Sequence, residues 1–463
     1  MRVFGHHISR AAFVLAGIEI LLVYACMQFA IFVVAGAPAA SSLLHPEAFF
    51  GSLVVVATLS LLGLYERGRR TLTFSIGGLV ETLRIGFGTL LGVLLFGLLH
   101  YHLAATALDP GVLTLGGVLA AAALPLERLL FWRIRSLDFF KRRLMVIGTG
   151  ERAAAIASVL DEDSPHRVAA YIDTGEDSTH DVRADWVVRL REGQNLLDLA
   201  GAFDVEEIVV AMHDRRGNLP VRQLLECKLQ GIAITDASTF FEREQQQIQL
   251  DSLNASWLVF GTGFRQSWLG NTVKRGFDVS VSLLLMLLTS PIMVATAIAI
   301  RLESPGPILY WQTRVGRGNQ HFDICKFRSM RPDAESDGLA RWAADNDDRI
   351  TAVGRVIRKL RIDELPQVYN VLKGEMSFVG PRPERPFFVE QLGTKIPYFL
   401  ARHSIRPGIT GWAQVRYPYG ASVEDARQKL QYDLYYVKNH TLFLDLVVMM
   451  ETVKVVVFGK GAR

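Results

Sequence analysis

The sequence KRGFDVSVSLLLMLLTSPIMVATAIAIR, residues 274–301, decides the fold of the C-terminal part of the chain. Its apolar stretch, 277–300, is longer than the ~20 residues needed to cross a hydrocarbon core. Both ends of the stretch carry Lys or Arg, and positive charge favours the cytoplasmic side of a membrane. Ser290-Pro291 lies near the centre, where the proline removes a backbone donor and kinks the helix.

This pattern predicts a re-entrant helix at 276–301 that enters the membrane, turns at Ser290-Pro291 and leaves on the same side. Each half would be roughly 15–20 Å long, about half the thickness of the hydrocarbon core. The Ser290 hydroxyl can bond to the carbonyl that Pro291 leaves free. The alternative is an ordinary kinked span, which would place all later residues on the other side of the membrane.

The N-terminal part of the chain contains four more apolar stretches of about the length of a membrane span. They are 11–36, 47–65, 79–103 and 111–132. Arg and Lys precede the first, surround the connection between the second and third, and follow the fourth, whereas the loops around 37–46 and 104–110 have none. This distribution predicts a multi-pass bundle with both ends in the cytoplasm. The bundle could serve as an anchor only or could also handle lipid.

Composition supports a membrane protein, because half of the 463 residues are hydrophobic. The formal net charge of +4 gives no reason to expect a nucleic-acid partner. The three cysteines, Cys26, Cys227 and Cys325, lie too far apart in sequence for a disulfide framework or a zinc motif.

The middle of the chain has the pattern of a nucleotide-binding fold. A predicted strand at 144–148 is followed by Gly148, Gly150 and Ala153, which match the spacing G-x-G-x-x-A. A second predicted strand ends at Asp173, about where an acid would bind a ribose. We expect a doubly wound, Rossmann-like α/β domain. The glycine pattern alone leaves open whether the domain binds a nucleotide or serves packing or regulation.

Residues 303–416 are rich in Arg, Gly, Pro and Asp, and they contain the adjacent acid pair Asp363-Glu364. The most distinctive segments are SPGPILYWQTRVG (304–316), FDICKFRSM (322–330), RKLRIDELPQVYNVLKGEMSFVGPRPE (358–384) and RPGITGWAQV (406–415). Cations set among tight turns suit a diphosphate ligand. An acid beside them suits a metal ion or a nucleophile.

These segments closely resemble the bacterial sugar transferase family, the polyprenyl-phosphate hexose-1-phosphate transferases or monotopic phosphoglycosyl transferases. The resemblance covers about 272–463, with several long motifs in order. The preceding bundle and Rossmann-like domain look like the large subtype of that family. The subgroup that serves exopolysaccharide synthesis beside exosortase systems is the most similar.

The resemblance implies transfer of a hexose-1-phosphate from a UDP-sugar to undecaprenyl phosphate, with release of UMP. Asp363 would be the nucleophile that forms a covalent phosphosugar–aspartyl intermediate, and Glu364 would support it. Both carboxylates would be ligands of Mg²⁺, a hard ion that suits carboxylates and substrate phosphates. Ser290-Pro291 matches the break in the family's re-entrant helix. The proposed substrate-binding residues are Lys326, Arg328 and Arg358 for the phosphates, and Arg382 with Pro381 and Pro383 on the nucleotide side.

The predicted fold class is a membrane α-helical bundle plus α/β domains. Its parts are a four-helix transmembrane bundle (1–135), a Rossmann-like domain (141–236), a connector (237–271) and a catalytic domain (272–463) that contains the re-entrant helix. The expected location is the bacterial inner membrane, with the catalytic domain on the cytoplasmic face and the lipid bilayer as a partner. The sequence does not decide which sugar is transferred, and it leaves a homodimer open.

Two other functions are compatible with parts of the sequence. Tyr369 and Lys373 have the Tyr-x-x-x-Lys spacing of NAD-dependent nucleotide-sugar dehydratases and epimerases, but no G-x-x-G-x-x-G loop precedes them after residue 264. A second alternative is a non-enzymatic nucleotide sensor or scaffold for polysaccharide assembly.

Overall fold

The computed structural model describes most of the chain. The described residues are 2–3, 6–7, 10–35, 45–61, 76–103, 109–135, 141–160, 164–175, 181–190, 194–212, 219–250, 264, 268–331, 334, 349–418, 420 and 422–458. The chain divides into two compact units, which consist mainly of Ile8–Phe240 and Phe241–Arg463. Strands β1 (Arg2–Val3) and β2 (His6–His7) form a short antiparallel pair at the N-terminus.

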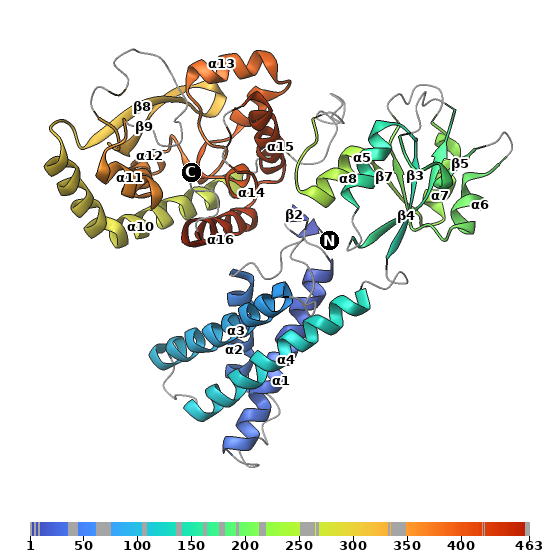
Figure 1. Ribbon diagram of the computed structural model, residues 1–463, viewed down its shortest axis with the longest axis horizontal. Coiled ribbons are helices and arrows are strands. Elements are labelled where there is room, and N and C mark those ends of the chain that lie inside the picture. The colour runs from blue at the N-terminus through green and yellow to red at the C-terminus, as the bar shows by residue number, and fades with distance from the viewer. Residues whose placement is uncertain are drawn as a thin grey trace. The chain divides into compact units, whose positions relative to one another are not determined.

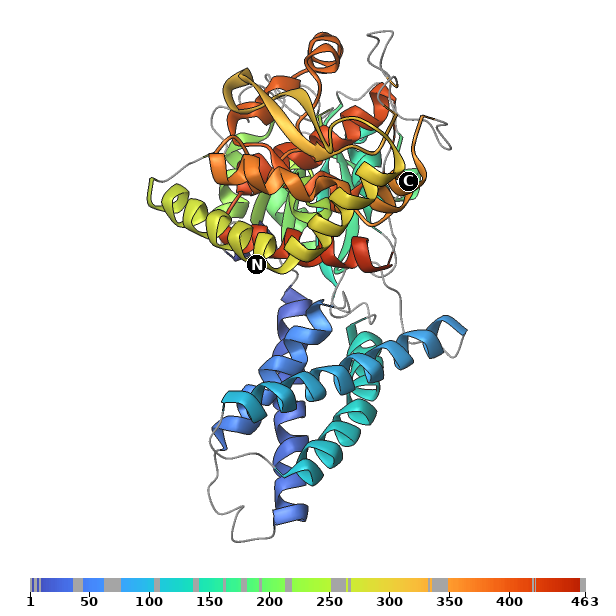
Figure 2. The ribbon, with the colours of Figure 1, turned by 90° about the vertical axis from the view of Figure 1, so that its left-hand side faces the viewer.

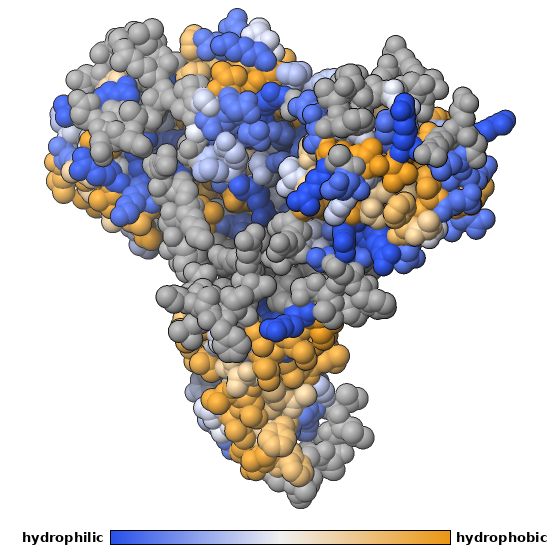
Figure 3. Space-filling view, turned by 45° about the vertical axis from the view of Figure 1, so that its right-hand side comes forward, coloured by the Kyte–Doolittle hydropathy of each residue, from blue (hydrophilic) through white to orange (hydrophobic). Residues whose placement is uncertain are grey.

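The predicted apolar helices of the N-terminal part are confirmed. They are α1 (Arg10–Ala35), α2 (Pro46–Leu61), α3 (Ile76–Leu103) and α4 (Pro110–Arg135). Two of them contain stretches long and apolar enough to cross a membrane, Val14–Val34 and Pro110–Phe131. Hydrophobic side chains dominate the face of the bundle that is visible in Figure 3. The basic connection around 67–70 lies outside the described residues.

One ion pair lies inside this bundle and joins its first and fourth helices. The Nε atom of Arg128 on α4 donates to Oε1 of Glu19 on α1 over 2.5 Å. The two side chains are 4% and 0% exposed, so neither charge is accessible to solvent. A buried charge is costly unless it is paired, and each residue here neutralises the other.

Removing one member of this pair is expected to destabilise the bundle. Arg128→Leu removes the guanidinium that pairs with the buried Glu19 carboxylate, which costs roughly 3–5 kcal/mol for a buried pair. The double variant Glu19→Leu/Arg128→Leu removes both charges and should recover most of that stability. Thermal unfolding of the purified protein in detergent measures both effects. Equal melting temperatures for the single and double variants would contradict this account of the pair.

The predicted α/β domain is confirmed as a five-stranded parallel sheet with the order β5-β4-β3-β6-β7 (Figure 1). The strands are β3 (Arg142–Ile147), β4 (His166–Asp173), β5 (Val187–Arg189), β6 (Glu207–Val210) and β7 (Ala233–Asp236). The associated helices are α5 (Glu151–Val159), α6 (Leu196–Ala202), α7 (Val221–Leu229) and α8 (Ala237–Gln245), with the short helix η3 (Ala184–Trp186) before β5. The central strands are buried on both faces, as is usual for a parallel sheet covered by helices.

From residue 268 on, the second unit consists of the membrane-length helix α10 followed by a mixed α/β module. Its first half contains α10 (Trp268–Glu303), the antiparallel strands β8 (Leu309–Val315) and β9 (His321–Phe327), η4 (Arg317–Asn319), α11 (Ala352–Lys359), η5 (Ile362–Gln367) and α12 (Val368–Lys373). Its second half contains β10 (Ser377–Val379), α13 (Pro386–Lys395), η6 (Phe399–Ser404), β11 (Gly408–Thr410), α14 (Trp412–Arg416), α15 (Val423–Asn439) and α16 (Leu442–Phe458). Strands β10 and β11 are parallel neighbours.

The main core of this unit surrounds Trp412, which is fully buried and stacks on Tyr435 with ring centroids 6.0 Å apart. Ile248 and Leu250 belong to the same buried cluster. Upstream of them, Glu242 accepts a hydrogen bond of 2.7 Å from Nζ of Lys438 on α15. Part of the segment 237–271, which we expected to be a connector, therefore packs into this core.

Helix α10 has the break that the sequence predicts. Figure 2 shows two arms that meet at an angle, and Pro291 lies inside the helix. The hydroxyl of Ser290 donates to the carbonyl of Leu287 over 2.9 Å, which is the carbonyl that Pro291 cannot pair with. Only 11% of the most apolar window of α10 is buried inside the protein, so its surface is available to lipid.

The basic residues at the start of α10 contact the module that follows. Both terminal nitrogens of Arg275 donate to carbonyls at the end of α12, Nη1 to Val371 at 2.5 Å and Nη2 to Leu372 at 2.7 Å. Lys274 pairs with Asp445 on α16 at 2.5 Å. These contacts fix the first arm of α10 against the rest of the unit.

Candidate active site

The acid pair Asp363-Glu364 lies in η5, directly after α11. Arg361 precedes η5 with φ of 57°, a left-handed conformation that residues with side chains rarely adopt. Such backbone strain gathers at functional sites when the surrounding structure enforces it. Asp363 and Glu364 are only 9% and 8% exposed. The chain therefore turns sharply after the basic helix α11 and places two carboxyl groups inside the protein.

The carboxylate of Glu364 is held by two cations. Its Oε1 atom lies 2.9 Å from Nζ of Lys326 on β9 and 2.8 Å from Nη2 of Arg382 in the loop after β10. Burial alone would raise the pKa of Glu364, but the charges of Arg382, Lys326 and Arg361 hold that pKa well below its usual value. Glu364 is therefore a fixed anion that joins three segments of the chain.

Asp363 has the opposite electrostatic character. Its Oδ1 atom is buried and makes no hydrogen bond to the part of the chain that the structure describes. Burial and the neighbouring Glu364 charge raise the pKa of Asp363, while Lys326, Arg358 and Arg361 oppose that rise. The surroundings thus raise the pKa of one carboxyl group and lower the pKa of its neighbour. Such a difference between adjacent carboxyl groups is typical of a catalytic site. The unpaired oxygen of Asp363 is the one available for a ligand or a substrate.

Lys326 lies at the centre of this group, on the strand that packs against η5. Burial lowers the pKa of Lys326, and the charges of Glu364 and Asp363 counteract this effect. Arg358, at the end of α11, is half-buried, and its charge acts on Asp363. The structure thus brings five predicted residues together: Lys326, Arg358, Asp363 and Glu364 interact, and Arg382 joins the group through Glu364.

Arg328 bonds to the turn that follows α10. Its guanidinium donates to the carbonyls of Pro305 and Ser304 and to the Ser304 hydroxyl, each at 2.9 Å. Arg328 is buried, and these bonds fasten the turn after α10 to the end of β9. Its predicted contact with substrate phosphate stays a prediction.

Pro381 and Pro383 shape the loop that carries Arg382. The carbonyl of Pro381 accepts a bond of 3.0 Å from the amide of Gly408, and the carbonyl of Pro383 accepts one of 3.1 Å from Nη1 of Arg314. A Cβ atom at Gly408 would lie 2.1 Å from the amide nitrogen of Gly380, so this close approach requires glycine. The prolines and glycines of this loop hold its backbone, and Arg382 supplies the charge.

Sequence reasoning missed a buried ion pair that supports this loop. Nη2 of Arg402 donates to the backbone carbonyl of Arg382 at 2.8 Å and lies 2.7 Å from Oδ2 of Asp433. Burial raises the pKa of Asp433 to about 6, although the charge of Arg402 opposes the rise. The signal that could have revealed this pair is the position of Asp433 among the aromatic residues of α15, because a buried charge needs a partner.

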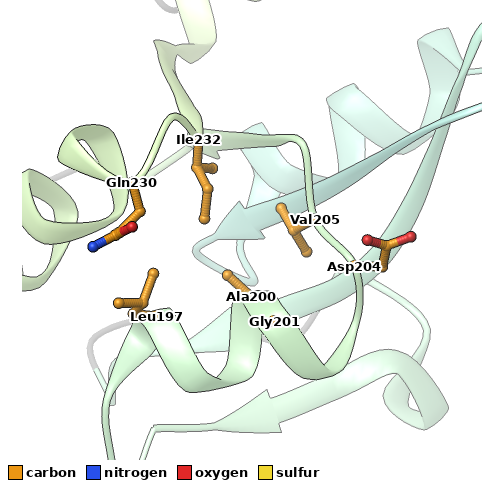
Figure 4. Close-up of a pocket in the computed structure, with 7 residues that line it drawn as sticks. All are labelled: Leu197, Ala200, Gly201, Asp204, Val205, Gln230 and Ile232. Carbon is orange, nitrogen blue, oxygen red and sulfur yellow. The ribbon is translucent and has the colours of Figure 1, made fainter.

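The α/β domain keeps the predicted glycine loop, and nucleotide binding there stays a prediction. Gly148 has φ of +115°, as the tight turn before α5 requires. The Oδ1 atom of Asp173 accepts a bond of 2.7 Å from the amide of Gly175 in its own turn. A hollow in this domain lies at the amino ends of β6 and β7 (Figure 4). The glycine loop, in contrast, follows the carboxyl end of β3. The hollow is lined by Leu197, Ala200, Gly201, Asp204, Val205, Gln230 and Ile232.

The Tyr369–Lys373 pair has local partners. The Tyr369 ring packs edge-on against Trp311, and Nζ of Lys373 lies 2.6 Å from Glu375. Both residues are on the short helix α12, next to the acid pair.

The protein has a pair of acidic residues surrounded by Lys and Arg side chains, and a kinked helix of membrane length lies next to them. These features define a class of membrane-associated protein whose site suits phosphorylated ligands. The model of the family described as "Bacterial sugar transferase" matches residues 269–459. A 30% identical relative, the undecaprenyl-phosphate galactose phosphotransferase of Salmonella typhimurium, matches over 358 residues, which are 71% of each chain. The chain belongs to the bacterial sugar transferase family.

Other relatives differ in the sugar that their names specify. The chain is 45% identical over 242 residues to the UDP-N-acetylgalactosamine-undecaprenyl-phosphate N-acetylgalactosaminephosphotransferase of Aeromonas hydrophila, with 52% of this chain and 56% of that protein covered. It is 34% identical over 277 residues to the UDP-glucose:undecaprenyl-phosphate glucose-1-phosphate transferase of Escherichia coli, with 59% and 58% covered. The chain thus spans little more than half the length of these two relatives.

Proposed function

We propose that this chain transfers a sugar-1-phosphate from a UDP-sugar to undecaprenyl phosphate and releases UMP, as the first membrane step of exopolysaccharide or related glycan synthesis. The observation that carries the proposal is the difference between the surroundings of the two carboxyl groups, Asp363 and Glu364. Glu364 is fixed by two cations, and Asp363 keeps a buried oxygen that has no hydrogen-bond partner among the described residues. The names of the relatives, which specify three different sugars on the same lipid, support the reaction type.

In the first half-reaction, a carboxylate oxygen of Asp363 attacks the β-phosphorus of the UDP-sugar. The bond between that phosphorus and the bridging oxygen breaks, and UMP leaves with the bridging oxygen. The product on the protein is an acyl phosphate that joins Asp363 to the sugar-1-phosphate. Burial removes water from the carboxylate and makes it a better nucleophile, while Lys326 and Arg358 balance the anions that must approach.

In the second half-reaction, a phosphate oxygen of undecaprenyl phosphate attacks the same phosphorus. The bond to Asp363 breaks, the carboxylate is regenerated, and the sugar ends on a polyprenyl diphosphate. Glu364 does not change its bonding in either step, because Lys326 and Arg382 keep it ionised. We assign it the role of fixing these two cations where the phosphates meet.

The residues present fit a divalent cation. Mg²⁺ commonly binds through one or two carboxylates together with substrate phosphates, and the buried unpaired Oδ1 of Asp363 is a suitable donor. No cluster of three or more metal-ligating side chains occurs among the described residues, so the phosphates would complete the coordination. When bound, Mg²⁺ would neutralise diphosphate charge. Asp363 and Glu364 remain its proposed ligands, although Oε1 of Glu364 is already engaged by two cations.

We also propose that the protein resides in the bacterial inner membrane with four spans, and that α10 is re-entrant with the catalytic module on the cytoplasmic side. Cytoplasmic UDP-sugar and the phosphate of the lipid can then reach Asp363 from the same side. The bend at Pro291 and the Ser290 hydrogen bond support this topology.

Cysteine labelling tests the topology of α10. Trp268 and Leu302, at its two ends, are 81% and 82% exposed and suit single replacements by Cys in a background without the native cysteines. Trp268→Cys and Leu302→Cys should both resist an impermeant maleimide added to spheroplasts and react after permeabilisation. Adding Pro291→Leu should restore helix propensity and convert part of the population to a spanning form. Labelling of Leu302→Cys alone from the periplasmic side would show an ordinary span.

The reaction itself is tested with the full chain in lipid vesicles. UDP-glucose, UDP-galactose and UDP-N-acetylgalactosamine are each supplied with undecaprenyl phosphate and Mg²⁺, and UMP is measured. At least one donor should give UMP in equal amount to the lipid product. Labelled UMP should also exchange into that donor without the acceptor, because the first half-reaction is separate. Release of UDP in place of UMP, or of neither nucleotide with any donor, would refute the proposed transfer.

A further inference from the structure

Asn370 is a buried amide that bridges the two segments that carry the candidate active site. It lies on α12 and is 0% exposed. Its Oδ1 atom accepts a bond of 3.0 Å from the amide of Cys325, and its Nδ2 atom donates to the carbonyl of Asp323 at 2.7 Å. The second hydrogen on Nδ2 points to Oε2 of Glu375 at 2.9 Å. All the hydrogen-bonding capacity of the amide nitrogen is therefore used.

Two of these partners lie on the strand that carries the site lysine. Asp323 and Cys325 belong to β9, and Lys326 follows Cys325 directly. Helix α12 continues η5 without a break, so Asn370 is held rigidly to Glu364 through the chain. The amide thus sets the separation between the strand that carries Lys326 and the turn that carries Glu364, whose side chains meet at 2.9 Å.

We infer that Asn370 is a positioning residue for the proposed transfer reaction. It touches no substrate-facing atom of the acid pair, and it acts by fixing Lys326 against Glu364 and Asp363. Only an amide supplies one acceptor and two donors in this arrangement: the acceptor serves a backbone amide, and the donors serve a carbonyl and a carboxylate. This inference rests on the proposed function, because its effect is read as a rate of UMP release.

The main test is Asn370→Asp, which keeps the size and the acceptor but loses both donors. The new carboxylate would face the carbonyl of Asp323 and the carboxylate of Glu375. We expect kcat for UMP release to fall about 10–100-fold, as for other residues that orient catalytic groups, with KM for the UDP-sugar changed by less than about 3-fold. Labelled-UMP exchange should fall by the same factor as kcat.

A matched control exists in the same unit. Asn439 is also buried, and its Nδ2 atom also donates to a carboxylate, Glu242 at 2.8 Å, and to a carbonyl, Tyr435 at 3.1 Å. These partners are on α8 and α15, which supply none of the site residues. Asn439→Asp should lower the melting temperature about as much as Asn370→Asp does, but leave kcat per folded molecule within about 2-fold.

A second substitution that exchanges the donor and the acceptor of one hydrogen bond should restore part of the lost activity. The double variant Asn370→Asp/Glu375→Gln lets the amide at 375 donate to the carboxylate at 370, which restores the bond with reversed roles. It should recover part of the lost kcat, at least about 3-fold. If Asn370→Asp does not accumulate as folded protein, Asn370→Ser is compared with Asn439→Ser by the same measurements, with the same expectation.

The outcomes separate the inference from the proposed function. Wild-type protein that releases no UMP from any donor refutes the function itself. Active wild-type protein together with equal kcat values for the Asn370 and Asn439 variants would refute the positioning role. A selective loss of kcat at Asn370 with recovery in the double variant establishes it.

Discussion

Asp363→Asn is expected to lower UMP release by about 10⁴-fold or more, because the amide cannot act as an anionic nucleophile. Wild-type protein given a UDP-sugar without acceptor should carry a phosphosugar adduct on Asp363, detectable by mass spectrometry of acid-quenched protein. The Asn variant should carry none and should not exchange labelled UMP. Asn is nearly isosteric with Asp, so the loss cannot be attributed to packing.

Stability provides an independent check on this variant. Burial raises the pKa of Asp363, so the folded state binds the proton more tightly than the unfolded state does. The stability linked to this group is therefore present at pH values below the unfolded pKa and is lost as pH rises through the folded pKa. Ionisation of Asp363 therefore costs stability, and Asp363→Asn should melt at the same temperature as the wild type or higher. An adduct on another residue, or turnover by Asp363→Asn, would refute the assignment of Asp363 as the nucleophile.

A smaller change at a neighbouring position should have a smaller effect. Glu364→Gln keeps an oxygen for Lys326 and Arg382 but removes the charge that fixes both. We expect this variant to retain measurable exchange of UMP, whereas Asp363→Glu, which moves the anion by one carbon, should retain at most a trace. The contrast distinguishes the nucleophile from the residue that supports it.

Much of the fold could be predicted because hydrophobic patterns report burial directly. The apolar helices, the strands around 144–148 and 168–172 and the break at Ser290-Pro291 are local features with strong periodicity or a distinctive residue. Strand β5 (Val187–Arg189) was missed because three residues are too short to show a pattern. The packing of Ile248 and Leu250 depends on residues about 180 positions further along the chain, so no local pattern could predict it.

The candidate site was only partly predictable, because the same residue type can bind a ligand or a backbone. Arg328 and Arg382 lie in similarly basic segments, yet Arg328 donates to carbonyls of its own unit and Arg382 pairs with Glu364. Nothing local distinguishes the two. Asn370 has no charge and lies in an ordinary helical segment, so its bonds to β9 become visible only in three dimensions.

Lys326→Met is expected to have the second largest effect, a loss of about 10²–10³-fold in kcat, because the cation lies at the point where the anions meet. Methionine preserves the length and the apolar stem of the side chain. Without Lys326, Oε1 of Glu364 keeps only Arg382, and one of the charges that lower the pKa of Asp363 disappears. The pKa of Asp363 should therefore rise further, and the acid limb of the pH–rate profile should move to higher pH.

Lys438→Met is the matched control for this loss. Lys438 is also buried, and its Nζ atom lies 2.7 Å from Oε2 of Glu242, so its removal likewise leaves a carboxylate short of a cation. Both variants should lose similar stability, since truncating a buried pair costs roughly 3–5 kcal/mol. Only Lys326→Met should lose rate per folded molecule and shift the pH profile. Equal losses of rate, or an unchanged profile for Lys326→Met, would mean that the cation at 326 supports the fold and takes no part in the chemistry, and the charge balance proposed for Asp363 would have to come from Arg358 and Arg361.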